Sequence, residues 1–166
     1  MDKALKPIEF NGIELVGIKI ELTKSQDENY FLIRNLWKKF NLELKNIKNR
    51  KSNNWEKFGI TYRENGCIFY MTSIKMADNI IIPQNMITTK IKQGRYLRFI
   101  HTGNMYDIKK TIYDIYKKIV PNLQFEIESN RKEGLIHFER YDYRFKWNNP
   151  ESLLEIYLPV NTYGNQ

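Results

Sequence analysis

The two halves of the chain carry the same succession of structural signals, about 80 residues apart. In each half, a strand-like run is followed by an amphipathic helix and then by two more strand-like runs. One helix covers only one face of a small sheet, so each β-α-β-β unit needs further cover for its apolar surface. The repeat therefore predicts an α+β fold of two β-α-β-β modules related by a pseudo-twofold axis, with antiparallel sheets, one main helix each and a cleft between the modules.

One amphipathic helix is expected in each module. Ser25 followed by Glu28 has the form of a capping box, which predicts that the first helix begins there and ends within the polar stretch 46–54. The second should span about residues 107–120 and end at Pro121, because proline cannot continue a helix. Apolar side chains recur at helical spacing in both: Tyr30, Ile33, Trp37, Phe40 and Leu44 in the first, and Ile108, Ile112, Ile115 and Ile119 in the second.

The remaining apolar runs are typical of strands. They cover residues 14–23, 55–62, 67–75, 95–101, 135–143 and 153–160. The Asn65-Gly66 pair favours a tight hairpin between the second and third runs. Residues 76–93 connect the modules, which we place at about 10–76 and 86–162. Because no low-complexity linker separates them, residues 1–166 are expected to form a single domain.

Cysteine and histidine, the usual ligands of zinc, are scarce in this chain. Cys67 is the only cysteine, and His101 and His137 are the only histidines, which excludes a Cys/His zinc site. The sequence contains no glycine-rich phosphate-binding motif, so no cofactor is expected. No apolar stretch approaches the roughly 18 residues of a membrane-spanning helix. We therefore expect a cytoplasmic protein without a metal or a membrane partner.

The chain is basic, with 27 Lys and Arg residues against 19 Asp and Glu residues and a formal net charge of +8. Such a balance raises the question of a nucleic acid or an acidic partner. The basic runs at 45–51, 109–110 and 117–118 stand among Asn and acidic residues, so we interpret them as solvated faces.

Four short motifs in this order and spacing indicate a family. They are the stretch 81–104 with its proline, Gly-x-Tyr and Thr-Gly turn, the run HFERYDYRF at 137–145, the run LLEIYLPV at 153–160, and LWKKF at 36–40 combined with FGITY at 58–62. With these motifs the chain resembles the GyrI-like small-molecule-binding family, whose members include the effector-binding domains of AraC-type and MerR-type multidrug transcription regulators.

The resemblance implies two SHS2-type modules with a ligand cleft at their junction. It further implies that the cleft binds a lipophilic, cationic or planar aromatic small molecule, so that the chain acts as a stand-alone sensor or sequestering protein. Direct DNA binding is not expected, because the domain pattern begins within about the first 15 residues and leaves no room for a DNA-binding domain.

Two carboxylates are candidate ligand contacts. Glu139 matches the family's drug-contacting carboxylate, and Glu155 matches an acidic residue that recurs on its last strand. Each also stands alone in an apolar, strand-like run, where an ionised group is costly unless it has a partner. A ligand cation can be that partner. The alternative is that Glu139 pairs with a neighbouring basic residue, and that Glu155, opposite the apolar alternation, is simply exposed.

Aromatic side chains are the second group of candidates. The resemblance implies that six of them lie on or near the cleft: Trp37, Phe40, Phe58, Tyr62, Tyr70 and Tyr141. Such rings could stack on a planar ligand and add cation-π attraction. For Trp37 and Phe40, a plain core position on the helix is an equally simple interpretation.

Two other functions remain open at this point. Members similar to this chain include hydrolases of cyclopropane-bearing toxins, and such an enzyme would use Glu139 or Glu155 to position water with Tyr141 as a donor. Gyrase-inhibitor relatives instead imply a protein partner, for which the net charge of +8 would suit an acidic surface. His101 and Cys67 are interpreted as structural residues.

Overall fold

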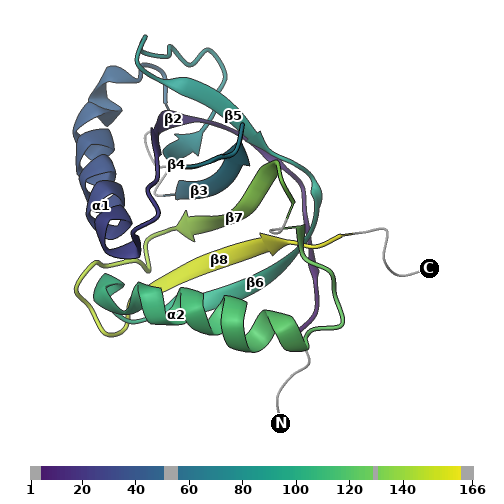
Figure 1. The fold of residues 1–166 in the computed structure, drawn as a ribbon. Helices are drawn as coiled ribbons and strands as arrows, with labels where there is room; N and C mark the ends of the chain where they lie inside the picture. The colour runs from purple at the N-terminus through teal and green to yellow at the C-terminus, as the bar shows by residue number, and fades with distance from the viewer. Residues whose placement is uncertain (1–4, 51–55, 129–130, 162–166) are drawn as a thin grey trace.

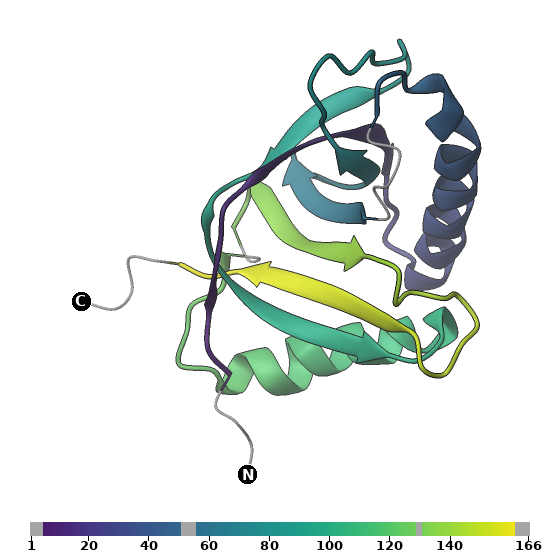
Figure 2. The same cartoon turned by 180° about the vertical axis from the view of Figure 1, so that it is seen from behind.

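A computed structural model describes residues 5–50, 56–128 and 131–161. A single antiparallel sheet curls through the molecule, and two helices cover one of its faces (Figures 1 and 2). Its strands are β1 (Ile8–Phe10), β2 (Ile13–Glu21), β3 (Lys57–Glu64), β4 (Cys67–Lys75), β5 (Ile87–Ile91), β6 (Gly94–Thr102), β7 (Gly134–Tyr141) and β8 (Leu153–Pro159). The α+β class predicted from the sequence is confirmed.

The strands are ordered β1-β6-β8-β7-β3-β4-β2-β5. At the centre, β3 of the first half pairs with β7 of the second, and Gly59 lies opposite Glu139. The halves therefore share one sheet of eight strands instead of forming separate sheets. The physical reason is that this pairing satisfies the backbone groups that each half would otherwise expose along an open edge.

The helical segments lie close to their predicted positions. They are α1 (Gln26–Glu43), η1 (Leu44–Asn46), η2 (Met105–Asp107), α2 (Ile108–Asp114), η3 (Ile115–Ile119) and η4 (Val120–Asn122). The Ser25 side chain caps α1 by accepting a hydrogen bond from the Glu28 backbone N–H at 3.2 Å. The η3 segment is π-helical and continues α2 directly. In the described ranges, no helix combines the length and the apolar character needed to cross a membrane.

Six strands match the predicted runs within a few residues, and two were not predicted. β1 is three residues long, and β5 lies within the expected connection 76–93. Both are edge strands, and both are too short to show a clear alternation. The predicted hairpin turn is confirmed, since Asn65 and Gly66 both have positive φ. Trp55, the predicted first residue of a strand, lies outside the described residues.

Apolar side chains form cores on both faces of the sheet. On the face away from the helices, one cluster draws residues from both halves, including Leu15, Phe58, Phe138 and Tyr157. On the other face, one cluster lies under α1 and another under α2 and η3. Because the sheet curls, strands that are distant in the strand order meet in the cluster on the face away from the helices. On the face that carries the helices, α1 and α2 leave a space between them above the central strands.

Candidate ligand-binding site

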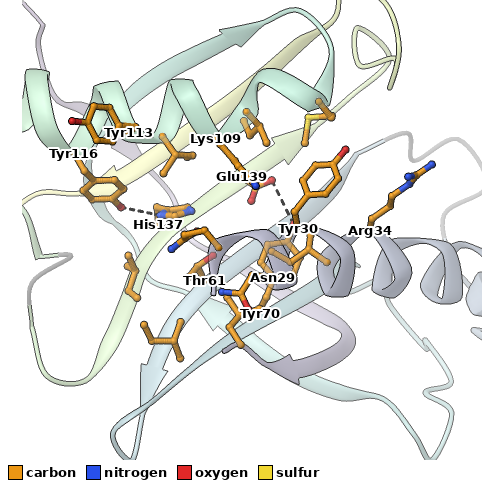
Figure 3. Close-up of a pocket in the computed structure, with 18 of the residues that line it drawn as sticks. Asn29, Tyr30, Arg34, Thr61, Tyr70, Lys109, Tyr113, Tyr116, His137 and Glu139 are labelled. Atoms are coloured by element: carbon orange, nitrogen blue, oxygen red, sulfur yellow. Dashed lines mark hydrogen bonds between the residues drawn. The ribbon is translucent and has the colours of Figure 1, made fainter. Parts of the chain in front are cut away.

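A pocket with a cavity volume of about 890 Å³ lies between the two helices and the sheet face that they cover. β3, β4 and β7 form its floor, while α1 forms one wall and α2 with η3 the other. The close-up in Figure 3 shows side chains from these elements pointing toward a common space. Both halves of the repeat thus contribute to one cavity, beside the β3–β7 pairing that joins them.

Glu139 is the one carboxylate that lines this pocket within the described part of the chain, and its residue is only 9% exposed. Its Oε2 accepts hydrogen bonds from the Tyr70 hydroxyl at 3.4 Å and from the Tyr141 hydroxyl. The Trp37 Nε1–H in turn donates to the Tyr70 hydroxyl at 3.0 Å. These four residues come from α1, β4 and β7, so the tertiary fold assembles a continuous chain of hydrogen bonds at the floor of the pocket.

The environment of this carboxyl makes its charge costly. Burial raises the pKa of Glu139 to about 7, because the loss of solvation outweighs the help from the two hydroxyl donors. Burial, followed by the charge of Glu139, also holds the pKa of Tyr70 and that of Tyr141 well above their ordinary values. Both tyrosines therefore remain hydrogen-bond donors, and no basic side chain in this hydrogen-bonded group neutralises Glu139.

Aromatic rings make up much of the pocket wall. The Trp37 ring lies edge-on to the Tyr141 ring, with centroids 4.9 Å apart, and at 6.5 Å from the Tyr70 ring. Four more aromatic residues line the same space: Tyr30, Tyr113, Tyr116 and Trp147. This composition can hold a flat or bulky aromatic molecule by apolar contact and by ring interactions.

His137 occupies the next position on the same face of β7. Its Nδ1 shares a hydrogen bond of 2.8 Å with the Tyr116 hydroxyl, as Figure 3 shows. Burial lowers the pKa of His137 to about 4, so the imidazole is neutral near pH 7. His137 thus adds a polar, uncharged group to the pocket and does not act as a cation next to Glu139.

Glu155 lies outside the pocket, although its sequence position suggested a parallel with Glu139. In the sheet it is paired with Arg140, and the alternation along β7 places Arg140 on the face opposite Glu139. Its Oε1 accepts a hydrogen bond from the Arg140 Nη1 at 2.6 Å, while Arg144 and Arg98 lie within 3.4 and 3.7 Å of Oε2. The buried charge is thus neutralised by arginines of the protein itself.

The eight residues predicted from the sequence divide into two equal sets. Trp37, Tyr70, Glu139 and Tyr141 line the pocket, whereas Phe40, Phe58, Tyr62 and Glu155 do not. Phe40, a residue of α1, is fully buried in the core under that helix. Phe58 belongs to the core on the other face of the sheet. The ring of Tyr62 stacks on Phe69, with centroids 5.7 Å apart.

Several pocket residues were not singled out from the sequence. His137, Glu139 and Tyr141 alternate along one strand, and that spacing alone could have placed all three on one face. Tyr30 stands on the predicted apolar stripe of the first helix and could have been found in the same way. The sequence contains no signal for Trp147, because it lies in an irregular connection between β7 and β8.

Comparison with known proteins agrees with this architecture. The chain is 24% identical over 105 residues to the transcriptional regulator BrlR of Pseudomonas aeruginosa, a match that covers 62% of this chain and 37% of that protein. The matched stretch thus spans well under half the length of that relative.

Two solved structures show the same fold. One is a protein bound to tetraphenylphosphonium, with a TM-score of 0.69 and 14% identity over 95% of this chain and 94% of the other. The other is an integron cassette protein of Vibrio cholerae, with a TM-score of 0.59 and 22% identity over 96% and 97% of the two chains.

Residues 8–160 match the family described as Cass2, integron-associated effector binding protein. This match covers all eight strands and every residue of the pocket. The chain belongs to this family of effector-binding proteins, which agrees with the effector-binding resemblance that its sequence motifs indicated.

Proposed function

We propose that the protein binds a lipophilic, cationic or planar aromatic molecule in the pocket between its helices and acts as an effector-binding sensor. The observation that carries this proposal is the buried Glu139, whose hydrogen-bond partners are all neutral. A carboxylate removed from water has already lost much of its solvation before a ligand arrives. A ligand cation therefore restores favourable electrostatics, at a cost in desolvation borne mainly by the ligand.

The size and surface of the pocket support the same ligand class. About 890 Å³ is ample for a molecule of several rings, and the lining residues Trp37, Tyr70 and Tyr141 contribute aromatic rings. Cation-π attraction adds about 0.5 to 2 kcal/mol for each desolvated contact. A protein of the same fold has been solved with tetraphenylphosphonium, a lipophilic aromatic cation, which makes this compound a suitable first probe.

The test is calorimetric titration of tetraphenylphosphonium into the wild-type protein and the Glu139→Gln variant at pH 8. Wild type should bind the cation, and the variant should lose at least about tenfold in affinity, roughly 1.4 kcal/mol. Triphenylphosphine oxide is the neutral comparison, and its affinity should respond little to Glu139→Gln. An absence of binding to wild type, or equal binding by both proteins, would falsify the proposal.

A matched control removes a carboxylate elsewhere. Glu9 lies on the edge strand β1, its side chain is 75% exposed, and its nearest basic group is Arg95 at 3.8 Å. Glu9→Gln changes the net charge as Glu139→Gln does, but leaves the pocket intact. Affinity for the cation should stay within about twofold of wild type, since long-range charge effects are screened by salt.

We also propose that the two halves are related by a pseudo-twofold axis at the β3–β7 seam. The strand order supports this idea, because β7-β8-β6 on one side of the seam corresponds to β3-β4-β2 on the other. The edge strands β1 and β5 then occupy equivalent places, each next to the first long strand of the opposite half. A ligand at the seam would be held by both modules.

Hydrolysis is a second candidate function, and one observation favours it. A carboxyl group with a pKa near 7, hydrogen-bonded to the Tyr141 hydroxyl, is suited to act as a general base toward water. The test is incubation of a cyclopropane-bearing electrophile with wild type and with Glu139→Gln, followed by mass spectrometry. A product gain of one water that requires Glu139 would support hydrolysis, and intact compound in both samples would exclude it for that substrate.

A further inference from the structure

The pocket that contains Glu139 is otherwise lined by basic charge. Five cationic side chains contribute to its lining against one carboxylate: Arg34, Arg63, Lys109, Lys110 and Lys117. A ligand that carried only positive charge would be repelled by this surrounding field as it approached the buried carboxylate. The basic side chains, together with Glu139, therefore constrain which charges a ligand can carry.

Three of these cations already have partners. The Arg63 Nη1 donates a hydrogen bond to the Arg131 carbonyl oxygen at 3.2 Å. Lys109 forms an ion pair with Asp27 across the gap between the helices, and the Arg34 guanidinium lies 5.6 Å from the centre of the Trp147 ring. Lys110 and Lys117 differ, since none of the ion pairs within the described ranges engages either side chain. Both are exposed, and both face the same cavity from α2 and η3.

The positive and negative groups lie at different depths. Glu139 is buried on β7, and His137 precedes it by two residues on the same face, a step of about 7 Å along a strand. His137 is hydrogen-bonded to Tyr116, whose neighbour in the chain is the exposed Lys117. The sheet side of the cavity therefore has a buried carboxylate. The helical wall carries two exposed ammonium groups that no ion pair among the described residues engages.

We propose that the ligand is a zwitterionic aromatic compound, whose cationic part reaches Glu139 while a carboxylate or similar anionic group pairs with Lys110 and Lys117. This inference rests on the cation-binding function proposed above and specifies its ligand class. An anionic group on the outer part of the ligand would be attracted by the positive charges of Lys110 and Lys117, which would repel a ligand that carried only positive charge. Such a molecule satisfies the buried and the exposed charges of the pocket at once.

The test uses two dyes with nearly the same fluorophore, a rhodamine free acid and its methyl ester. At pH 8 the free acid carries both a cationic ring system and a carboxylate, whereas the ester is a simple cation. Fluorescence anisotropy should give about fivefold tighter binding of the free acid to wild type, as expected for two exposed ion pairs. In Lys110→Gln/Lys117→Gln, the preference should fall below about twofold, with the affinity for the ester unchanged or higher.

The control is Lys38→Gln/Lys39→Gln, which removes two exposed charges from α1 outside the pocket lining. It should retain the preference for the free acid. If wild type binds the ester as tightly as the acid, the zwitterion inference is wrong while the cation-binding function stands. A preference that survives in Lys110→Gln/Lys117→Gln would contradict the roles of these lysines. If neither dye binds wild type, both the inference and the proposed function fail.

Discussion

At the scale of single residues, Glu139 and Glu155 show how one residue type on neighbouring strands can serve two purposes. Both are buried in the sheet, at 9% and 4% exposure. Glu155 is surrounded by arginine side chains, whereas Glu139 accepts its hydrogen bonds from two tyrosine hydroxyls. A buried, ionised group without a counter-charge is stabilised strongly by a cation that reaches it, so Glu139 is the carboxylate suited to bind a cationic ligand.

The raised pKa of Glu139 predicts a pH-dependent affinity for cations. Only the ionised carboxylate attracts a cation, and with a pKa of about 7 the ionised fraction rises between pH 6 and pH 8. If the bound cation keeps Glu139 ionised, affinity for tetraphenylphosphonium should increase about tenfold over this range. Calorimetry in buffers of different ionisation enthalpy should detect proton release on binding at pH 6.

Glu139→Gln is the control for this effect, since its side chain does not titrate. Its weaker binding should be flat with pH, as should the binding of triphenylphosphine oxide to wild type. Affinity that fell from pH 6 to pH 8 in wild type would contradict the assignment of Glu139 as the charge partner. His137 does not complicate this range, because burial lowers its pKa to about 4.

At the scale of elements, the register of β3, β4 and β7 positions the polar chain of the pocket. Gly59 on β3 pairs with Thr72 on β4 and with Glu139 on β7. A Cβ atom built on Gly59 would lie 2.1 Å from the Tyr70 hydroxyl, a separation that real contacts never show. Glycine at this position therefore leaves the space in which Tyr70 reaches Glu139.

Gly59→Ala should displace Tyr70 and weaken its hydrogen bonds to Trp37 and Glu139. We expect the free energy of unfolding to fall by about 1 to 3 kcal/mol and cation affinity to fall severalfold, because the added methyl group overpacks the pocket floor. Urea denaturation and calorimetric titration would measure both effects.

Gly94→Ala is the matched control. Its added Cβ would have only one neighbour within 4 Å, a Tyr96 ring atom at 3.9 Å. Binding should remain at the wild-type level, and stability should change by less than about 0.5 kcal/mol. Equal losses of affinity in the two variants would argue against a specific role for the space beside Gly59.

At the scale of the whole molecule, one sheet and one shared core join the two halves. Phe138 of the second half stacks on Tyr157 at 4.6 Å and lies 6.4 Å from Phe58 of the first half. The β3–β7 ladder adds backbone hydrogen bonds across the same seam. Neither half can lose its structure without exposing apolar surface of the other, so the modules should unfold together.

Phe138→Leu tests this cooperativity. The variant should lower the free energy of unfolding by about 1 to 2 kcal/mol, because a ring that contacts both halves is replaced by a smaller side chain. Native-state hydrogen exchange should show equal losses of protection for the amides of β4 and β8, which belong to different halves. A loss confined to β8 would instead indicate that the modules unfold independently.

The sequence by itself determined the succession of elements, the capping of α1 by Ser25 and the hairpin at Asn65 and Gly66, since these depend on local periodicity and local hydrogen bonds. Its motifs also indicated the effector-binding family, to which the match over residues 8–160 assigns the chain. Both strands that it missed are short edge strands, held mainly by pairing with distant partners.

Only the tertiary structure decided which candidate side chains meet. Glu139 and Glu155 look alike in the sequence, and the sheet register alone sends one into the pocket and the other among arginines. The sequence likewise did not show that Lys110 and Lys117 share a cavity with Glu139, because that arrangement depends on how α2 and η3 pack against the curled sheet. Burial, charge partners and pocket shape are long-range properties, and they arise only when residues distant along the chain pack together.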